Sequence, residues 1–237
     1  MALPTMDLPT YELEIPSTRK KIKYRPFLVK EEKVLLMAME TEDEKSIRDA
    51  TLGLLKSCIQ SRVKIEDLAT FDLEYIFLNI RAVSVGEIVQ LMITCDDDGE
   101  TQVKYNLNLT DVSVIFPEGH DNKIMLNDTT GVIMKYPSFD RFVEGNISEK
   151  EITPDQITEI IAESIDQIFQ GEDVYDSSTT SKKEFIKFVE ELTNAQLEKL
   201  QKFFETSPRL EHSFKVTNPN TGVESEYTLR GLQSFFV

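Results

Sequence analysis

The stretch TFDLEYIFLNIRAVSVGEIVQLMIT, residues 70–94, is where the apolar density of the chain is highest. Its first part places apolar residues at helical spacing on two faces, which predicts a core helix over residues 70–85. Thr70 is a candidate cap, Asp72 suits the positive end of the helix dipole, and Gly86 lets the chain leave the helix. The residues from 88 to 94 then predict a buried strand, and we expect the rest of the chain to pack around this helix and strand.

The polar residues of this helix predict a narrow exposed strip. Asp72 and Asn79 stand two turns apart, and so do Glu74 and Arg81. The charged residues Asp72, Glu74, Arg81 and Glu87 interrupt the apolar run within fewer than ~20 residues, so the stretch is too short and too polar to cross a membrane.

Upstream of this stretch, the sequence predicts an extended arm, one hairpin and two helices. Residues 1–16 are rich in proline and have no helical period. Apolar residues alternate over 11–15 and again over 22–27, around a Ser-Thr turn, which is typical of a hairpin. Helical spacing follows over 30–40 and 42–60.

Downstream of the central helix, the apolar period changes to two. Residues 89–93 and 103–109 flank a turn rich in Asp and Gly, and 124–126 and 132–136 flank another polar turn. Both patterns predict antiparallel hairpins.

The C-terminal third begins with a clear helix start. Thr153 and Gln156 have the spacing of a capping box, and Pro154 falls at the first helical position. Apolar residues line one side as far as Phe169, so we expect an amphipathic helix that ends at Gly171.

Two further capping boxes predict two short helices after it. Ser181 with Glu184 precedes one apolar stripe, and Thr193 with Gln196 precedes the next.

These elements together predict an α+β fold, in which a helical layer packs with several antiparallel β-hairpins. The last hairpin spans 213–229. We expect three regions: 1–29, an extended arm and the first hairpin; 30–150, a central α+β region around the buried helix; and 151–237, a helical segment that ends in a hairpin.

A faint repeat links two of the hairpins. Residues 93–112 (ITCDDDGETQVKYNLNLTDV) and 214–232 (FKVTNPNTGVESEYTLRGL) share a strand, a polar turn with Gly, and a strand with Tyr. Duplication explains this likeness, and so does convergence on the same hairpin chemistry, which we favour.

Charge and cysteine content limit the partners. The formal net charge of −16 repels phosphate backbones and anionic membranes, so we expect neither nucleic acid nor membrane as a partner. The basic segment 19–25 alternates its cations with Ile22 and Tyr24, which favours the exposed face of a strand over a nucleic-acid site. Cys58 and Cys95 make no disulfide framework and no signal peptide is evident, so we expect synthesis in a reducing, intracellular compartment.

The sequence carries no recognised enzyme motif. It has no Walker A motif, G-x-G-x-x-G, H-E-x-x-H or G-x-S-x-G. His120 and His212 are the only imidazoles, and an exposed loop histidine is favoured over a catalytic one. We therefore expect no catalytic residue, no cofactor and no small-molecule substrate.

A metal site is not expected either. Cys95 and His120 could share a metal with nearby aspartates, but Asp98 stands where the second cysteine of a CxxC knuckle would be. Asp96, Asp97 and Glu100 crowd carboxylates as calcium loops do, yet the alternating ligand spacing is absent, which favours a solvated turn.

Several unusual strings resemble one family across nearly the whole chain. They are YELEIPST, KIKYRPFLVKEEKVLLMA, FDLEYIFLNIRAVSVGE, IMKYPSF, VTNPNTG and LRGLQSFF. The chain thereby resembles the baseplate hub proteins of T4-like contractile-tailed phages, and especially those of cyanophages.

The resemblance implies a late structural or assembly protein of the phage tail. It would be a hub subunit, or a factor that helps the hub form, and would bind other hub and tail proteins in the host cytoplasm during assembly and in the virion baseplate. The resemblance transfers no catalytic residue. Related tail-assembly proteins resemble zinc ribbons in their hairpins, and this chain departs from them at Asp98 and throughout 218–222.

Two alternatives remain beside the hub subunit. One is a transient assembly chaperone that is absent from the mature virion. The other is a hub-associated hydrolase, which would require a perturbed carboxylate pair in a deep pocket.

The C-terminus supplies the candidate partner-binding residues. Leu232, Phe235 and Phe236 follow the last hairpin, where an apolar cluster needs a covering surface. Docking on the chain's own helices and docking on a hub protein are both open, and the first is favoured.

Overall fold

The computed structural model describes residues 7–41, 43–137, 154–231 and 234. Contacts divide the chain into two compact units, 1–115 with 139–148 and 209–237, and 116–138 with 149–208. This grouping differs from the three regions 1–29, 30–150 and 151–237, which stay a prediction about separate domains. The fold class is α+β with small antiparallel sheets, as expected.

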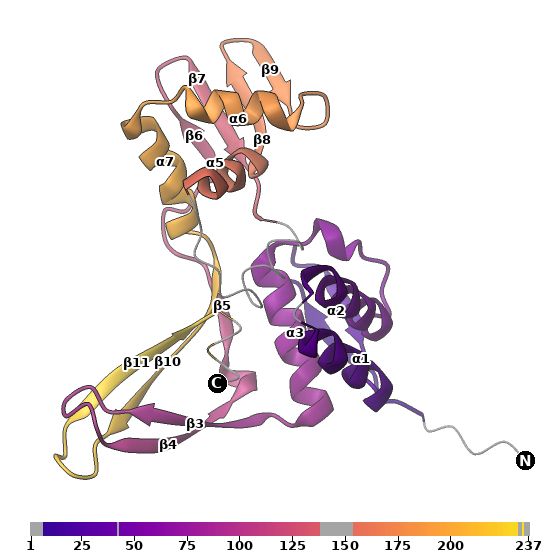
Figure 1. Ribbon diagram of the computed structural model, residues 1–237, viewed down its shortest axis with the longest axis vertical. Coiled ribbons are helices and arrows are strands. Elements are labelled where there is room, and N and C mark those ends of the chain that lie inside the picture. Colours follow the sequence, from indigo (N-terminus) through magenta and orange to yellow (C-terminus); the bar gives the residue numbers. More distant parts are fainter. Residues whose placement is uncertain (1–6, 42, 138–153, 232–233, 235–237) are drawn as a thin grey trace, which may run out of the picture. The chain divides into compact units, whose positions relative to one another are not determined.

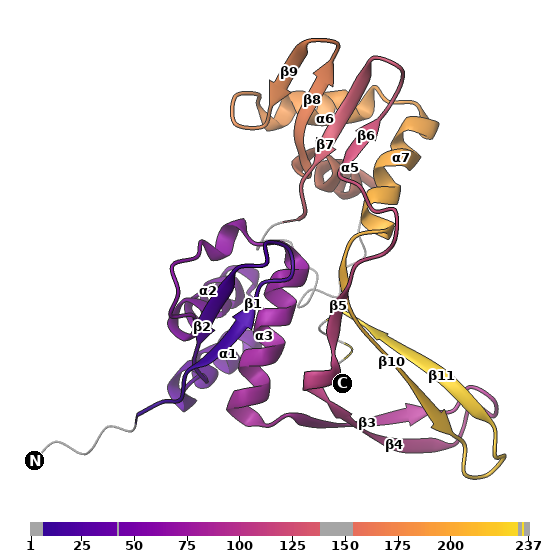
Figure 2. The ribbon, with the colours of Figure 1, turned by 180° about the vertical axis from the view of Figure 1, so that it is seen from behind.

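The first unit begins with a hairpin and three helices (Figure 1). The elements are β1 (Tyr11–Glu14), β2 (Lys21–Tyr24), α1 (Val29–Glu40), α2 (Glu44–Cys58), a short 3-10 helix (Ile65–Asp67) and α3 (Thr70–Val85). Figure 2 views the same hairpin from the opposite side. β2 also joins the end of α2, because the backbone N–H of Gln60 donates to the carbonyl of Lys23 at 2.8 Å.

Helix α3 is the core helix that the sequence predicts. Leu73, Ile76 and Leu78 have no exposed surface, and Gly86 follows the helix with a φ of 139°. The expected cap is wrong by one residue, because Ala69 takes the N-cap position and Thr70 is the first helical residue.

The sequence predicts an exposed polar strip along α3, and this prediction is wrong for the N-terminal part of the helix. Asp72 is fully buried and Glu74 nearly so. The turn between β1 and β2 covers Asp72, which accepts a hydrogen bond from the backbone N–H of Ser17 at 2.9 Å and another from the Ser17 hydroxyl. Burial raises the pKa of Asp72, while these hydrogen bonds oppose the rise.

Two hairpins and a short strand complete the first unit. β3 (Ile88–Thr94) pairs with β4 (Gln102–Asn108), and a 3-10 turn (Leu109–Asp111) leads to β5 (Ser113–Ile115). β10 (Arg209–Thr217) pairs with both β5 and β11 (Glu224–Arg230). The expectation of a buried β3 is wrong, because Leu91 is its only buried residue while Ile88 and Met92 are exposed. A two-stranded sheet leaves one face of β3 uncovered.

The second unit pairs a four-stranded sheet with three helices. The strands are β6 (Lys123–Met125), β7 (Thr130–Met134), β8 (Ile165–Gln170) and β9 (Asp173–Asp176), in that order across the sheet. The helices are α5 (Pro154–Glu163), α6 (Lys182–Glu190) and α7 (Asn194–Glu205). Figures 1 and 2 show α5 and α6 on one face of the sheet.

The sequence predicts a helix that runs as far as Gly171. This prediction is wrong beyond Glu163, where α5 ends. Ile165 and Ile168 are buried in strand β8. They stand three residues apart, which is helical spacing, and the register shift between Ile133 and Met134 of β7 is what fits this spacing into the sheet. Gln170 pairs with Asp173, so Gly171 and Glu172 form a two-residue hairpin loop in which Gly171 has a φ of 60°.

The capping boxes at Ser181 and Thr193 are confirmed, whereas the box predicted at Thr153 lies outside the described residues. The Glu184 carboxylate accepts the backbone N–H of Ser181 at 2.9 Å, and the Gln196 side chain accepts that of Thr193 at 2.9 Å. The hairpins predicted around residues 18, 98, 128 and 220 are confirmed as well.

Candidate protein-binding surface

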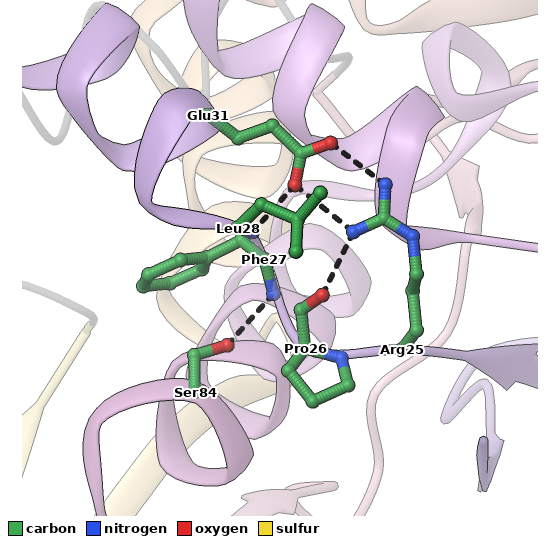
Figure 3. Close-up of polar contacts among 6 residues, drawn as sticks. All are labelled: Arg25, Pro26, Phe27, Leu28, Glu31 and Ser84. Carbon is green, nitrogen blue, oxygen red and sulfur yellow. Dashed lines mark hydrogen bonds and ion pairs between the residues drawn. The ribbon is translucent and has the colours of Figure 1, made fainter. Parts of the chain in front are cut away.

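A part-buried ion pair fixes the start of α1 (Figure 3). The two terminal nitrogens of Arg25 donate to the two carboxylate oxygens of Glu31 at 2.9 and 2.7 Å. Nη1 of Arg25 also donates to the carbonyl of Pro26 at 2.8 Å. A bidentate pair of this kind fixes the orientation of both side chains.

The same carboxylate caps the helix. Oε2 of Glu31 accepts the backbone N–H of Leu28 at 2.7 Å, which satisfies a donor just before the first turn. The backbone N–H of Phe27 donates to Oγ of Ser84 at 2.9 Å, so the segment before α1 is tied to the last turn of α3.

The charges at this anchor stabilise each other. The side chains of Arg25 and Glu31 are only 15% and 12% exposed. The hydrogen bond from Arg25 lowers the pKa of Glu31, against the effect of burial, and the hydrogen bond to Glu31 raises the pKa of Arg25. Both groups therefore stay charged at neutral pH, and the RPFLVKEE segment holds α1 at a fixed start.

Beyond this anchor, α1 leaves an unusual amount of apolar surface uncovered. Ala38 is its only buried residue. Five apolar residues of α1 are between 48% and 81% exposed: Val29, Val34, Leu36, Met37 and Met39. We call these five residues the α1 face.

Two further apolar residues are exposed where α3 ends and β3 begins. They are Val85 and Ile88, and Val85 directly follows Ser84, whose hydroxyl accepts the backbone N–H of Phe27. An exposed apolar surface of this extent is typical of a site that another molecule covers. Methionines suit such a surface because their side chains adapt to different partners.

The partner-binding residues expected from sequence, Leu232, Phe235 and Phe236, lie outside the described residues. The α1 face was missed from sequence, although the string KEEKVLLMAME carries a signal. Its apolar residues occupy positions all round the helix, more than one buried stripe can use.

The basic segment 19–25 forms an exposed strand face, as expected, except at Arg25. Ile22 and Tyr24 are buried, whereas Lys21 and Lys23 are exposed. Lys23 lies 3.8 Å from Glu12 on the paired strand.

Neither histidine is the exposed loop residue that the sequence favours. His120 is part-buried, with Nδ1 at 3.0 Å from Thr206 Oγ1 and Nε2 at 2.9 Å from the Tyr136 hydroxyl. Burial lowers its pKa. His212 is also part-buried, with Nε2 at 3.3 Å from the Tyr105 hydroxyl. Both rings thus serve aromatic and hydroxyl contacts.

The two thiols are not activated nucleophiles. Burial raises the pKa of Cys58 to about 11. Burial and the neighbouring aspartates raise the pKa of Cys95. A thiol with a raised pKa is protonated at neutral pH and reacts slowly.

Metal-ligating groups do not converge in the part of the chain that the structure describes. No group of three His, Cys, Asp or Glu residues there could hold a metal ion. Cys95 and His120 belong to different compact units. The acidic turn 96–100 is exposed, as expected, but two of its carboxylates accept hydrogen bonds from residues of the β10–β11 loop.

The second unit contains a groove of ≈ 480 Å³. Its lining includes Leu126, Ile168, Tyr175, Phe188 and Glu184. The Glu184 carboxylate is committed to the cap of α6, and its hydrogen bonds with Ser181 lower its pKa.

Across the described residues, no helix has both the length and the apolar character that crossing a membrane requires.

These features define an α+β protein whose most exposed apolar element is a helix face suited to contact with other proteins. A family model described as T4 bacteriophage base plate protein matches residues 8–237. Because this match covers nearly the whole chain, the protein belongs to the T4 bacteriophage base plate protein family. No curated protein and no solved structure gives a significant match.

Membership confirms the sequence resemblance at the level of the baseplate family. It makes the chain a phage baseplate structural protein, located in the virion tail and in contact with other phage tail proteins. A structural family also suggests a non-enzymatic role.

Proposed function

We propose that this chain is a subunit or assembly factor of the baseplate hub, and that it acts by binding other hub proteins through the α1 face. The observation that carries the proposal is the combination of a fixed helix start and an uncovered apolar helix. Arg25 and Glu31 hold the base of α1, while Val34, Leu36 and Met37 are each more than half exposed.

A fixed helix makes a better binding element than a mobile one. Association costs free energy when side chains and backbone must become ordered, and a helix held at its base has already met part of that cost. The partner that fits is a tail protein with an apolar groove, because an apolar helix face binds by insertion into such a groove.

The net charge suits this role. A charge of −16 keeps the free protein soluble despite its apolar face, and it disfavours binding to the phage DNA. We propose that the action is non-enzymatic and requires no cofactor.

The test compares two double variants of α1 in infected cells. Val34→Ser with Met37→Ser removes two residues of the α1 face, whereas Lys33→Ser with Glu40→Ser changes two exposed polar residues of the same helix and leaves the net charge unchanged. We expect the first variant to lose at least about tenfold in co-purification with hub proteins, since central apolar contacts commonly contribute more than ~1 kcal/mol each. The second variant should co-purify like the wild type. Equal co-purification of both variants would remove the α1 face from the proposal.

Analysis of purified mature virions separates the two forms of the proposal. A protein present in virions is a hub subunit. A protein that co-purifies with hub proteins from infected cells but is absent from virions is a transient assembly chaperone. Absence from both would contradict a role in the hub.

The C-terminal residues Leu232, Phe235 and Phe236 stay a second predicted surface. Deletion of residues 233–237 tests them, with thermal stability and co-purification measured separately. Lost stability means that the terminus is part of the core, and lost co-purification alone means that it is an interface. If neither changes, the terminus contributes to neither.

A further inference from the structure

The tips of the two long hairpins in the first unit share one loop design. In the β3–β4 tip, the backbone N–H of Gly99 donates to the carbonyl of Cys95 at 2.9 Å. In the β10–β11 tip, the backbone N–H of Gly222 donates to the carbonyl of Asn218 at 2.8 Å. Both glycines have positive φ, 68° and 78°. Each loop therefore closes on a left-handed glycine four residues after the acceptor.

Side chains join the two tips. Nδ2 of Asn218 lies 2.9 and 3.1 Å from the two carboxylate oxygens of Asp97, and 2.9 Å from Oδ2 of Asp98. The Thr221 hydroxyl donates to Asp97 Oδ2, and Nδ2 of Asn220 donates to Oγ1 of Thr101 at 2.9 Å. The contacts therefore connect two loops that lie far apart in the sequence.

Asn218 is the centre of this junction. Only 1% of its surface is exposed, and both ends of its side chain are used. Its Oδ1 accepts the backbone N–H groups of Asn220 at 2.9 Å and Thr221 at 3.4 Å, while its Nδ2 faces the two aspartates. An amide nitrogen has only two hydrogens, so the carboxylate oxygens around it share them.

This arrangement has the residue spacing of a zinc ribbon. In a zinc ribbon, two hairpins each present a C-x-x-C knuckle, and four thiolates surround one metal ion. Here the corresponding positions hold Cys95 and Asp98 in one loop, and Asn218 and Thr221 in the other. Successive backbone N–H groups that converge on one acceptor form the type of concavity that holds an anionic ligand, and in this chain Asn218 Oδ1 is the acceptor.

We infer that the two hairpin tips form a metal-free clasp with the geometry of paired zinc knuckles, in which the Asn218 amide bridges two aspartates and joins the hairpins as a zinc ion would. Hydrogen bonds to a carboxylate are stronger than those between neutral groups, so one buried amide can hold two loops together. The inference does not depend on the proposed hub function.

The charges in the clasp agree with this role. Hydrogen bonds from Asn218 and Thr221 lower the pKa of Asp97. Hydrogen bonds from Thr101, and then from Asn218, lower that of Asp98. Both carboxylates are therefore charged acceptors at neutral pH, and the clasp needs no proton or metal to form.

The first test removes the bridge. Asn218→Ala should speed amide hydrogen exchange at Gly99 and Gly222 by about tenfold or more, because the variant loses hydrogen bonds to charged groups. Asn106→Ala is the matched control, since Asn106 is exposed on the β3–β4 hairpin and its side chain accepts a hydrogen bond from the facing Gln90. Unchanged exchange at both glycines in Asn218→Ala would overturn the clasp.

The second test asks whether the four positions have knuckle geometry. Asp98→Cys, Asn218→Cys and Thr221→Cys, combined in one chain, add three thiols to Cys95. We expect this triple variant to bind one Zn²⁺ per chain and to give the absorption bands of a tetrahedral thiolate site with Co²⁺.

The control moves each new thiol by one residue, as Asp97→Cys, Thr217→Cys and Asn220→Cys. We expect it to bind neither metal stoichiometrically. Failure of the first triple variant to bind, or equal binding by both, would contradict the knuckle geometry. In the native chain, we expect elemental analysis to find less than stoichiometric zinc and chelators to leave the melting temperature unchanged.

Discussion

Helices α3 and α1 belong to the same compact unit and are both rich in apolar residues, but they use those residues in opposite ways. Along α3, Leu73, Ile76 and Leu78 are completely buried, and even the carboxylate of Asp72 is enclosed. Along α1, Ala38 alone is buried, and the five residues of the α1 face are exposed.

This difference separates folding from binding within one unit. The unit's core forms around α3, where burial of apolar side chains stabilises the fold. α1 needs little of that core, because its base is held by an ion pair and a backbone hydrogen bond. Its apolar side chains are thereby exposed to solvent, and this exposure supports the binding role that we propose for α1.

The largest expected effect comes from a charge in α3. Ile80→Asp places a carboxylate at a residue that is 1% exposed. We therefore expect the free energy of unfolding to fall by more than about 4 kcal/mol, and no soluble folded protein to form. The sequence suggests the same outcome for Phe77→Asp, but Phe77 is only half-buried, so its loss should be smaller.

The matched control for these variants is Met37→Asp on α1, which should remain folded. Circular dichroism and thermal melting of the three proteins measure the difference. Wild-type melting of Ile80→Asp would contradict the assignment of α3 as the core helix.

The second effect concerns the anchor of α1. Glu31→Gln can keep the hydrogen bond from the Leu28 backbone but leaves Arg25 without its ionic partner. We therefore expect the free energy of unfolding to fall by about 2–3 kcal/mol at pH 7. Chemical denaturation measures it. Glu14→Gln breaks the exposed pair with Arg19, in which the Arg19 and Glu14 side chains are 71% and 45% exposed, and should cost less than about 0.5 kcal/mol.

The pH dependence of this loss follows from the lowered pKa of Glu31. A lowered pKa in the folded state adds stability above the ordinary glutamate value, and that stability is lost as the pH falls through the folded value. The gap between wild type and Glu31→Gln should therefore shrink in acid. A gap that stays constant as the pH falls well below the ordinary glutamate value would mean that the ion pair does not contribute.

The sequence predicts elements best where the local signals are strong. The 70–85 helix and the 88–94 strand have the predicted bounds, because a sustained helical period and a terminal glycine mark them. The capping boxes at Ser181 and Thr193 locate α6 and α7 for the same reason.

Features that depend on distant segments could not be predicted. Ile165 and Ile168 have helical spacing, and only the irregular pairing of β8 with β7 and its pairing with β9 place them in a strand. Asp72 is buried because Ser17 supplies donors from another hairpin. The contact of Asn218 with Asp97 spans 121 residues, so no local pattern could reveal it.

The third effect concerns the buried carboxylate of α3. Asp72→Asn keeps the shape of the side chain, and the amide can accept from the Ser17 backbone and donate to its hydroxyl. We expect the free energy of unfolding to change by no more than about 1 kcal/mol at pH 7, because the loss of charge-assisted hydrogen bonds and the removal of the desolvation cost oppose each other.

Acid should then favour the wild type over Asp72→Asn. The pKa of Asp72 is raised in the folded state, so the stability gained on protonation is fully present below its ordinary value and is lost as the pH rises through the folded value. The free energies of unfolding of both proteins are measured by denaturation from neutral pH down to the ordinary aspartate value. The stability of the wild type relative to Asp72→Asn should increase over this range. A difference that does not vary with pH would show that Asp72 is less buried than the structure indicates.

The smallest expected effect is on the stability of α1 variants, and it decides whether the contrast between the two helices is real. Val34→Ser with Met37→Ser removes apolar atoms that already contact water, so folding loses little of their burial, and serine lowers helix propensity by only a few tenths of a kcal/mol per residue. We expect the free energy of unfolding to fall by less than about 1 kcal/mol, whereas Ile76→Ser in α3 should lose several times as much. Chemical denaturation of both proteins at neutral pH gives the comparison. If the α1 variant loses as much stability as the α3 variant, its side chains are covered by the chain itself, and the face that we assign to a hub partner belongs to the core instead.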